Sequence, residues 1–356
     1  MAKILIKNGR VWDGERFFYA DVLTDGGAIA EIGEGITAPA TFTYDASGAI
    51  VSAGLVDAHV HLRGISCEKF GTQAEMSSFP FGVTAAADAS GERGDVSRLE
   101  AMMLKSVVFA KVEFCSNRAD FTKTEETLAR FSERAVGIKV YFDTTMSDIR
   151  NAAPLREACD FAHARGLRVM VHCAHAPTPM TEILDALGKG DILTHSFHGG
   201  ENNAAEDGFA SMRAAQARGV VIDVGFAGHV HTDFAVLGDA LRSGITPDVI
   251  STDITRLSAF TRGGRYGMTM CMSMARALGM RQEDIFRAVT AAPAAALGKG
   301  NAWGRLSVGG SADLAVFDPD ANEPFDLLDK AGNRLSGARG YRCLLTVADG
   351  EVVYRY

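Results

Sequence analysis

Short apolar runs alternate with helical patterns through the middle of the chain, and this alternation predicts a parallel β/α arrangement. Runs of four to eight apolar residues are typical of strands that are buried on both faces. The first predicted strand leads directly into His59. Seven more are expected at Val83–Ala87, Val108–Phe114, Gly137–Phe142, Arg168–His172, Ile192–His195, Val220–Val224 and Val249–Thr252. Helical patterns such as Leu155–Arg165 and Phe209–Arg218 lie between them.

Glycines mark the joints at which predicted helices give way to strands. Gly166, Gly219 and Gly244 each follow a helical pattern, where glycine is the expected helix stop. Eight β/α units of roughly 30 residues fit a (β/α)8 TIM barrel, which takes about 250 residues. A doubly wound sheet is the alternative, but no glycine-rich phosphate loop opens the first β/α turn.

Both ends of the chain have a different pattern, of short strands separated by hairpin turns. Lys3–Ile6 ends at Asn8-Gly9, and the strand Ala20–Thr24 ends at Asp25-Gly26-Gly27. Similar patterns occur at Ala28–Ile32, Ala312–Phe317, Cys343–Val347 and Glu351–Tyr354. We therefore expect a small β-sandwich domain formed by residues 1–52 plus 303–356, and a barrel formed by residues 53–302.

Composition excludes several classes of partner. The 356 residues are 47% hydrophobic and 22% charged, with a net charge of −8, which gives no electrostatic reason to expect nucleic acid or an anionic membrane. No apolar segment is long enough to cross a bilayer, and the N-terminus lacks the pattern of a signal peptide. The six cysteines are scattered without a CxxC pair, so reduced thiols in a cytoplasmic protein are expected.

Candidate metal ligands gather at the ends of the predicted strands. His59 and His61 lie one residue apart, so on a strand they face the same side and can hold one divalent metal. Active-site groups of a barrel come from the C-terminal ends of its strands. Four more chemistry-bearing residues lie on or at the ends of later strands: Lys139, His172, His195 and Asp253. Each alone is commonly a structural residue, but six at matching positions favour one site.

Lys139 is the most informative of these residues, because a charged ammonium in an apolar strand is costly. Its amine can instead react with carbon dioxide to form a carbamate, an N6-carboxylysine that bridges two metals. His59, His61 and Asp253 are expected to hold the more buried metal, and His172 with His195 the other. Metals bridged in this way share a water and lower its pKa. Asp253 is then expected to accept the proton of that water and deliver it to the leaving group.

This constellation resembles the amidohydrolase superfamily, in particular its binuclear branch with a carboxylated lysine. The resemblance includes the entry Gly54–His61 and the late segment Gly304–Asp318. It implies two divalent ions, usually Zn²⁺, a barrel flanked by a β-sandwich, and hydrolysis at a carbonyl or phosphoryl centre. The strand-end segments around Lys139, His172, His195 and Asp253 further resemble a dihydroorotase-like group of deacetylases that act on small N- or O-acylated acids.

The chain departs from these relatives on strands five and seven. The relatives tend to carry Gly-Glu after the strand-five histidine, where this chain has Cys173–Pro177. They also tend to carry histidine at the position of Phe226, whereas here His229 and His231 follow a little later. A retained metal cradle with a different substrate pocket is therefore expected.

Arg63 is the first candidate for substrate recognition, because it follows His61 by two residues and its guanidinium suits a carboxylate. The His-x-His-x-Arg pattern resembles that of dihydroorotases, whose arginine grips a substrate carboxylate, although a surface arginine remains the alternative. Further candidates lie in strand-end loops: Asn117, His175, His198, His229 and Arg256. Gly199–Asn203 and Thr261–Arg265 are expected to be mobile loops that could cover the site.

The leading hypothesis is a zinc-dependent, deacetylase-like hydrolase that cleaves an amide or ester bond in a small, carboxylate-bearing substrate. The alternative is a cyclic amidohydrolase of the dihydroorotase or hydantoinase type, and a third is an inactive barrel that serves as a binding partner. The intact ligand set argues against the third. The oligomeric state stays open, although barrels of this kind often associate.

Overall fold

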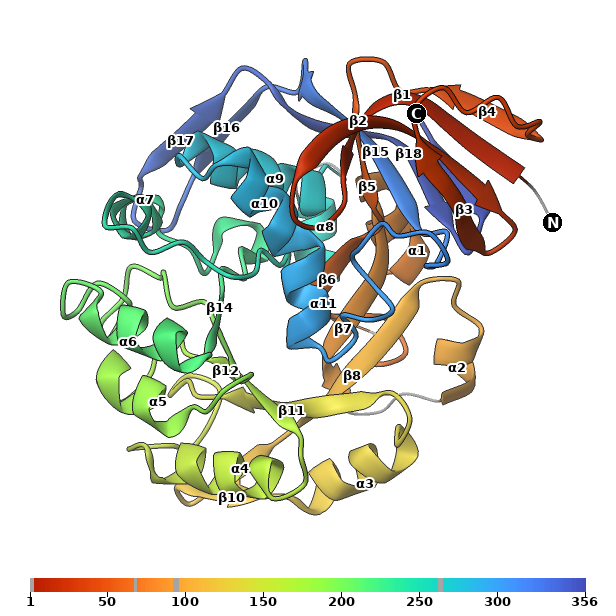
Figure 1. Cartoon of the computed structure of the whole chain (residues 1–356). Helices are drawn as coiled ribbons and strands as arrows, with labels where there is room; N and C mark the ends of the chain where they lie inside the picture. The colour runs from red at the N-terminus through yellow and green to blue at the C-terminus, as the bar shows by residue number, and fades with distance from the viewer. Residues whose placement is uncertain (1–2, 67–68, 92–95, 262–264) are drawn as a thin grey trace.

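Seven parallel strands curl around a common axis and are surrounded by helices (Figure 1). The computed structural model describes residues 3–66, 69–91, 96–261 and 265–356, apart from the side chains of His229, Phe260 and Thr261. The parallel strands are β6 (Leu55–Val60), β7 (Val83–Gly91), β8 (Lys105–Lys111), β11 (Ala135–Tyr141), β12 (Arg168–His172), β13 (Ile192–Thr194) and β14 (Val221–Asp223). They pair in chain order, so the C-terminal ends of all seven strands lie at the same rim.

The chain segment 249–254 closes the ring. It is too irregular to count as a strand, but Val249 bridges β14 at Asp223 and Ile254 bridges β6 at Val60. Between these bridges, Asp57 of β6 accepts hydrogen bonds from the backbone N–H of Thr252 at 3.1 Å and from its hydroxyl at 2.6 Å. The predicted eighth strand thus occupies the expected place, and the hydrogen bonds of Asp57 hold it where regular strand pairing is missing.

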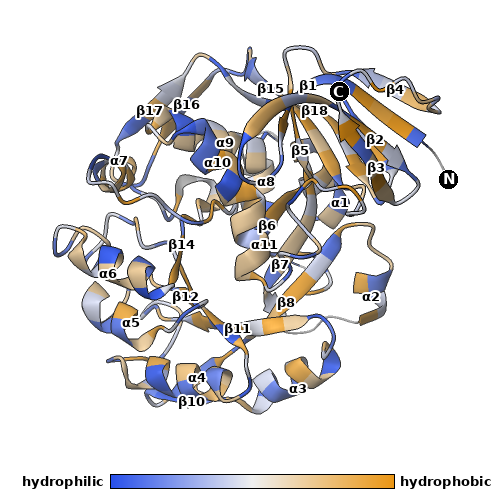
Figure 2. Ribbon diagram, in the orientation of Figure 1, coloured by the Kyte–Doolittle hydropathy of each residue, from blue (hydrophilic) through white to orange (hydrophobic). Residues whose placement is uncertain are grey.

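Helices cover the outside of the ring, and hydrophobic residues are concentrated on the strands they cover (Figure 2). The helices are α1 (Ala74–Ser78), α2 (Val96–Glu100), α3 (Thr122–Arg130), α4 (Ala153–His163), α5 (Met180–Ala186), α6 (Ala210–Arg218), α7 (Phe234–Arg242), α8 (Arg256–Thr261), α9 (Met268–Ala277), α10 (Gln282–Val289) and α11 (Ala291–Ala296), with 3₁₀ turns η1 (Phe79–Phe81) and η2 (Ala227–His229). The helical predictions at 155–165 and 209–218 correspond to α4 and α6.

Helix α11 packs across the start of the barrel strands. Its Ala294 joins a buried cluster with side chains from five strands: Val56, Ala85, Val107, Met170 and Ile192. Most of these strand residues lie in the first half of their strands, so α11 covers the N-terminal end of the barrel. The predicted ligands lie at the opposite, C-terminal end of the barrel, which is the end that carries the active site in barrel enzymes.

Both chain termini contribute to a mixed eight-stranded sheet beside the barrel (Figure 1). Its strands are β1 (Lys3–Trp12), β2 (Phe17–Asp25), β3 (Ala28–Gly33), β4 (Phe42–Asp45), β5 (Ile50–Ala53), β15 (Leu314–Ala321), β18 (Gly340–Ala348) and β19 (Glu351–Arg355). The sheet has its own apolar core, which includes Ile4, Val22, Val51, Val316 and Leu345. The predicted fold class, a (β/α)8 barrel with a β domain from both termini, is confirmed; boundaries after residues 52 and 302 stay a prediction.

Two details of the predicted strands are wrong. Asn8-Gly9 is not a hairpin turn: β1 continues to Trp12, and the left-handed Asn8 (φ 61°) lies in a bulge where the pairing with β2 shifts. The third barrel strand ends at Lys111, and Glu113–Cys115 forms β9, which pairs with β10 (Arg118–Asp120) in a separate hairpin. In both places a local change of backbone direction interrupts an apolar run that reads as continuous.

Another hairpin, β16 (Phe325–Leu328) with β17 (Arg334–Gly337), extends from the C-terminal part of the chain toward α7. It brings residues that follow the barrel in sequence back to the barrel rim. None of the helices in the described ranges combines the length and the apolar character that a membrane crossing requires.

Candidate metal centre

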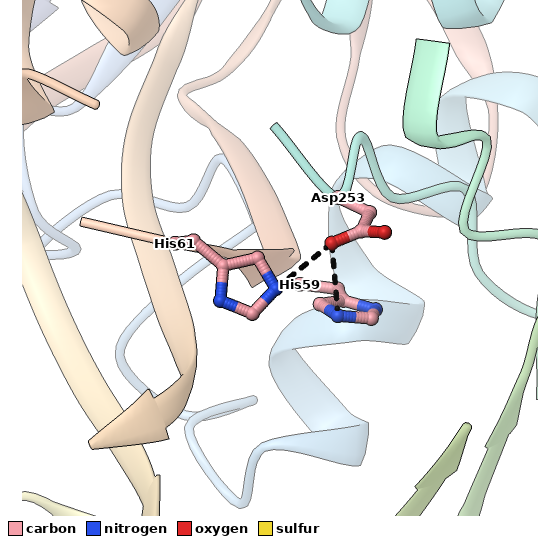
Figure 3. A group of neighbouring side chains, drawn as sticks. All are labelled: His59, His61 and Asp253. Carbon is pink, nitrogen blue, oxygen red and sulfur yellow. Dashed lines mark ion pairs between the residues drawn. The ribbon is translucent and has the colours of Figure 1, made fainter. Parts of the chain in front are cut away.

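His59, His61 and Asp253 converge at the rim, where β6 ends beside the closing segment (Figure 3). The Oδ1 atom of Asp253 lies 3.2 Å from His59 Nε2 and 3.0 Å from His61 Nε2. All three side chains are buried, and their potential ligand atoms lie within 4.8 Å of one another. This group can hold a metal ion.

The far side of each imidazole is fixed by hydroxyl groups from neighbouring strands. His61 Nδ1 lies 3.0 Å from Ser90 Oγ and 3.2 Å from Ser66 Oγ, and Ser66 in turn donates to the buried carboxylate of Asp88. His59 Nδ1 lies 3.3 Å from Thr194 Oγ1. With Nδ1 held in this way, the Nε2 atoms are the ones that face Asp253, an arrangement typical of metal-binding histidines.

Lys139 lies in the same buried cluster, as its place on β11 predicts. Its side chain is fully buried, and Nζ lies 3.2 Å from His59 Nε2. Burial lowers the pKa of Lys139 to about 8, against the opposing influence of Asp253 and Asp223. A substantial fraction of this amine is therefore neutral near physiological pH, which is the form that reacts with carbon dioxide.

His172 and His195 lie next to this group, with ring centroids 4.7 Å apart. His195 Nδ1 donates to the carbonyl of Gly225 at 2.7 Å, so Nε2 is the unprotonated nitrogen, and it lies 3.6 Å from Asp253 Oδ2. Asp253 therefore presents one oxygen to His59 and His61 and the other to His195. Burial lowers the pKa of both His172 and His195, which keeps these rings neutral.

Backbone strain accompanies these positions. His195 (φ 65°) and Asp253 (φ 46°) both have left-handed backbone conformations, which residues other than glycine adopt only with steric strain. Gly225 makes room for His195: its own φ is +57°, and a Cβ atom there would collide with Thr194 and His195. Strain of this kind is typical of functional sites, and here it aims two side chains at one point.

One residue of the site was missed by sequence reasoning. Asp143 follows β11 and is almost completely buried; His172 Nε2 donates to it at 3.0 Å and His175 Nδ1 at 2.9 Å. Burial would raise the pKa of Asp143, but these hydrogen bonds outweigh it and hold the pKa well below the usual range. The signal available was its position, four residues after Lys139 at the end of a predicted strand.

His231, a strand-end histidine whose role the sequence left undecided, also lies at the site. Its ring centroid lies 4.6 Å from that of His195 and 5.0 Å from that of His172. Burial lowers its pKa to about 3. A neutral histidine therefore forms the outer wall of the second histidine pair.

The donor set fits divalent cations. Within the described part of the chain, Asp253 Oδ1 and His195 Nε2 are buried and form no hydrogen bond. Buried polar atoms normally have a partner, and these two point into a cluster of neutral imidazoles and one carboxylate. Imidazole nitrogen and carboxylate oxygen together are ligands typical of zinc and related metals.

The residues expected to bind substrate are spread around the rim. Arg63 is exposed in the turn after β6, and Arg256 is exposed at the start of α8. The amide of Asn117 accepts from the backbone of Arg150 at 2.7 Å and donates to Asn151, so it ties the β9–β10 turn to a neighbouring loop. Contacts of these three side chains with substrate stay predictions.

The predicted loop histidines and loops have mixed outcomes. His175 and His198 both line a cavity next to the metal centre, together with Gly199 and Gly200. The side chain of His229 and residues 262–264 of the predicted Thr261–Arg265 loop lie outside the described residues. Mobility of the two loops stays a prediction.

Comparison with known proteins agrees with this geometry. The model of the Amidohydrolase family matches residues 50–340, which spans the whole barrel and its junctions with the terminal sheet. The chain belongs to the amidohydrolase family. The resemblance inferred from the ligand pattern is therefore confirmed.

Among its relatives within this family, the amidohydrolase chain is similar to two proteins named deacetylase. One, from Enterococcus faecalis, is 29% identical and aligned over 98% of both chains. The other, from Agrobacterium fabrum, is 30% identical over 84% of this chain and 78% of the relative. A solved dihydroorotase structure covers 99% of this chain and 98% of its own, with a TM-score of 0.86 at 25% identity.

Proposed function

We propose that this amidohydrolase is a zinc-dependent, deacetylase-like enzyme that hydrolyses an amide or ester bond in a small, carboxylate-bearing molecule. The observation that carries the proposal is the convergence of Lys139, four histidines and Asp253 within one buried cluster. The similarity to two proteins named deacetylase, one of them along its full length, supports the choice of reaction.

In this proposal, His59, His61 and Asp253 would hold one cation and His172 with His195 a second, and a carboxylated Lys139 would contribute to both. When bound, such cations supply a water of lowered pKa and polarise the acyl carbonyl. The ring nitrogen of His172 left for this role is Nδ1, because Nε2 donates to Asp143. These assignments require neutral imidazoles, and burial lowers the pKa of His59, for example, to about 4.

Asp253 is proposed to move the proton. Burial alone would favour its protonated form, but the surrounding histidines hold the pKa of its carboxyl well below the usual range, so it starts as a base. Its two oxygens face different histidines, which places it between the two halves of the site. A group in this position can accept a proton on one side and release it to the leaving nitrogen or oxygen on the other.

The proposal is tested by loading the purified protein with zinc in the presence of bicarbonate, counting the bound metal, and assaying acylated amino and hydroxy acids. We expect two zinc ions per chain and release of the free acyl group. Isotopically labelled bicarbonate should give a carbamate signal in the NMR spectrum that is absent from Lys139→Ala. Protein that binds no divalent metal and hydrolyses no substrate under these conditions contradicts the proposal and favours an inactive barrel.

A cyclic amidohydrolase of the dihydroorotase or hydantoinase type is the second candidate. The similarity to a dihydroorotase structure along almost the whole chain favours it. Dihydroorotate and hydantoins therefore belong in the same substrate panel. Turnover of these rings, with none of the acyclic acylated acids, reverses the ranking.

A further inference from the structure

A cavity of about 230 Å³ lies between the loops that follow β12, β13 and β14 and the turn of the β16–β17 hairpin. His231 belongs to its wall and also packs against the rings of His172 and His195. The cavity is therefore separated from the second histidine pair by one side chain. A small substrate whose acyl group lies at the metal centre has this cavity within reach of its other end.

Lys330 lies in the cavity wall on a turn that is firmly held. The preceding Asp329 is buried and accepts from the backbone N–H of Phe234 at 2.8 Å. Asn333, at the other end of the turn, donates to Asp233 at 3.0 Å. The hairpin turn is thus fastened to the start of α7 on both sides of Lys330, which fixes where its exposed side chain begins.

The charge of Lys330 is not balanced by a carboxylate. Among the described residues it forms no ion pair. Asp233 is the carboxylate of the cavity wall, but its Oδ1 accepts from Asn333 and from the backbone N–H groups of Ala235 and Val236 at the start of α7. The N-terminus of a helix offsets negative charge at this position. The carboxylate of Asp233 is thus held by α7 and Asn333 and does not pair with Lys330.

Two buried side chains in the same wall have polar atoms without a hydrogen bond in the described structure, namely His198 Nε2 and Thr232 Oγ1. His198 Nδ1 accepts from the backbone N–H of Gly200 at 3.1 Å, so the neutral ring carries its hydrogen on Nε2. The backbone carbonyl of Cys173 favours the protonated ring, but it makes no hydrogen bond of ordinary geometry to Nε2. The Nε2–H of His198 and the hydroxyl of Thr232 can therefore each donate a further hydrogen bond.

We propose that this cavity is the subsite for the carboxylate of the acylated substrate, and that Lys330 is the cation that contacts it. The inference rests on the proposed hydrolytic function and makes it more specific. It assigns the carboxylate to the side of the rim formed after strands β12–β14. Arg63, the candidate from sequence, lies in the turn after β6 and is exposed.

The test compares N-acetyl derivatives of alanine, leucine and phenylalanine with the matching carboxamides, which lack the negative charge. We expect Lys330→Met to raise KM for the carboxylates roughly tenfold, with kcat little changed, because a charge-assisted contact is lost. The carboxamides should be unaffected, and Lys330→Arg should retain most of the preference. Lys123→Met is the matched control, because Lys123 is an exposed lysine on α3. High salt should weaken the wild-type preference, because the ammonium is exposed.

Arg63→Met separates the two candidates for the carboxylate contact. A carboxylate-selective rise in KM for Arg63→Met, with none for Lys330→Met, overturns the assignment. Equal losses for acids and carboxamides in Lys330→Met overturn it as well, because they indicate a general effect on the rim.

Calorimetric titration of the same N-acetyl compounds distinguishes failure of the subsite from failure of the proposed function. Binding that depends on Lys330 but is followed by no hydrolysis contradicts the proposed function and supports the subsite. Hydrolysis that is indifferent to Lys330 supports the function and overturns the subsite. Absence of both binding and hydrolysis overturns both.

Discussion

The two halves of the proposed metal centre are built by different means. His59 and His61 come from one strand end, and their Nδ1 atoms are held by hydroxyl groups of Thr194, Ser66 and Ser90. His172 and His195 come from two strands and are held by a loop carboxylate and a backbone carbonyl. The first half is enclosed by the barrel, whereas the second borders the cavity through His231.

This difference suggests a division of labour. Ligands held by strand residues can change little without disturbing the barrel, which suits permanent metal binding. Ligands held from loops can be adjusted together with the cavity, which suits a half that faces varied substrates. Asp253 contacts both halves, and Lys139 contacts His59 and is proposed to contribute to both cations, so changes at these two residues are expected to have the largest effects.

Lys139→Ala should abolish metal binding in both halves of the site together. It removes the only amine in the cluster of described ligands, and we expect activity to fall by at least about a thousand-fold, with loss of bound metal. Metal analysis and turnover measure this directly, and short carboxylic acids should restore part of the activity by replacing the carbamate. Lys111→Ala is a matched control, because Lys111 pairs with Lys139 across β8 and β11 but its amine contacts Glu113 at 3.2 Å. Full turnover in Lys139→Ala would contradict the proposal that a carboxylated Lys139 contributes to both cations.

Removal of metal should distinguish the halves by their order of release. A chelator is expected to take the cation at His172 and His195 first, because this half borders a cavity. Removal of a metal ion that was present at a hundredfold excess over its Kd lowers the free energy of unfolding by roughly 3 kcal/mol. Metal content and thermal unfolding followed over time should show two stages, the second with the larger fall in stability. Simultaneous release of both ions would remove the distinction between the halves.

Asp143→Asn should weaken the second half alone. The carboxylate accepts hydrogen bonds from both His172 and His175, and the amide of asparagine holds the His172 ring less well. Changes to the residues that support metal ligands typically cost about 10–100-fold in metal affinity or activity. We expect one metal to be retained and the other to bind more weakly, as measured by metal titration. Thr145→Val is the control, because it removes a hydrogen bond to the other oxygen of Asp143. Equal weakening of both ions would argue against a local effect.

The same division explains how far sequence alone could reach. His59 and His61 are readable because a strand sets their common side, and Lys139 is conspicuous because it interrupts an apolar strand. The barrel follows from the alternation of strands and helices. By contrast, Asp143, His231 and Lys330 are placed by loops and by a distant hairpin, and loop conformation leaves no periodic signal. Asn8-Gly9 has the composition of a turn, yet pairing with β2 continues past it and turns it into a bulge.

The smallest effect is expected where the first half has two supports for one ring. Ser66 and Ser90 both lie within hydrogen-bonding distance of His61 Nδ1, and Ser90 also contacts Ser66 at 2.9 Å. Ser90→Ala leaves Ser66 in place, so the cost should be about 1 kcal/mol or less in metal binding. The double variant Ser66→Ala with Ser90→Ala should cost clearly more than the sum, because the ring then loses both partners. Strictly additive losses in metal titrations would show that the two hydroxyl groups act on His61 independently. In that case neither hydroxyl group compensates for loss of the other, and the first half would not differ from the second in this respect.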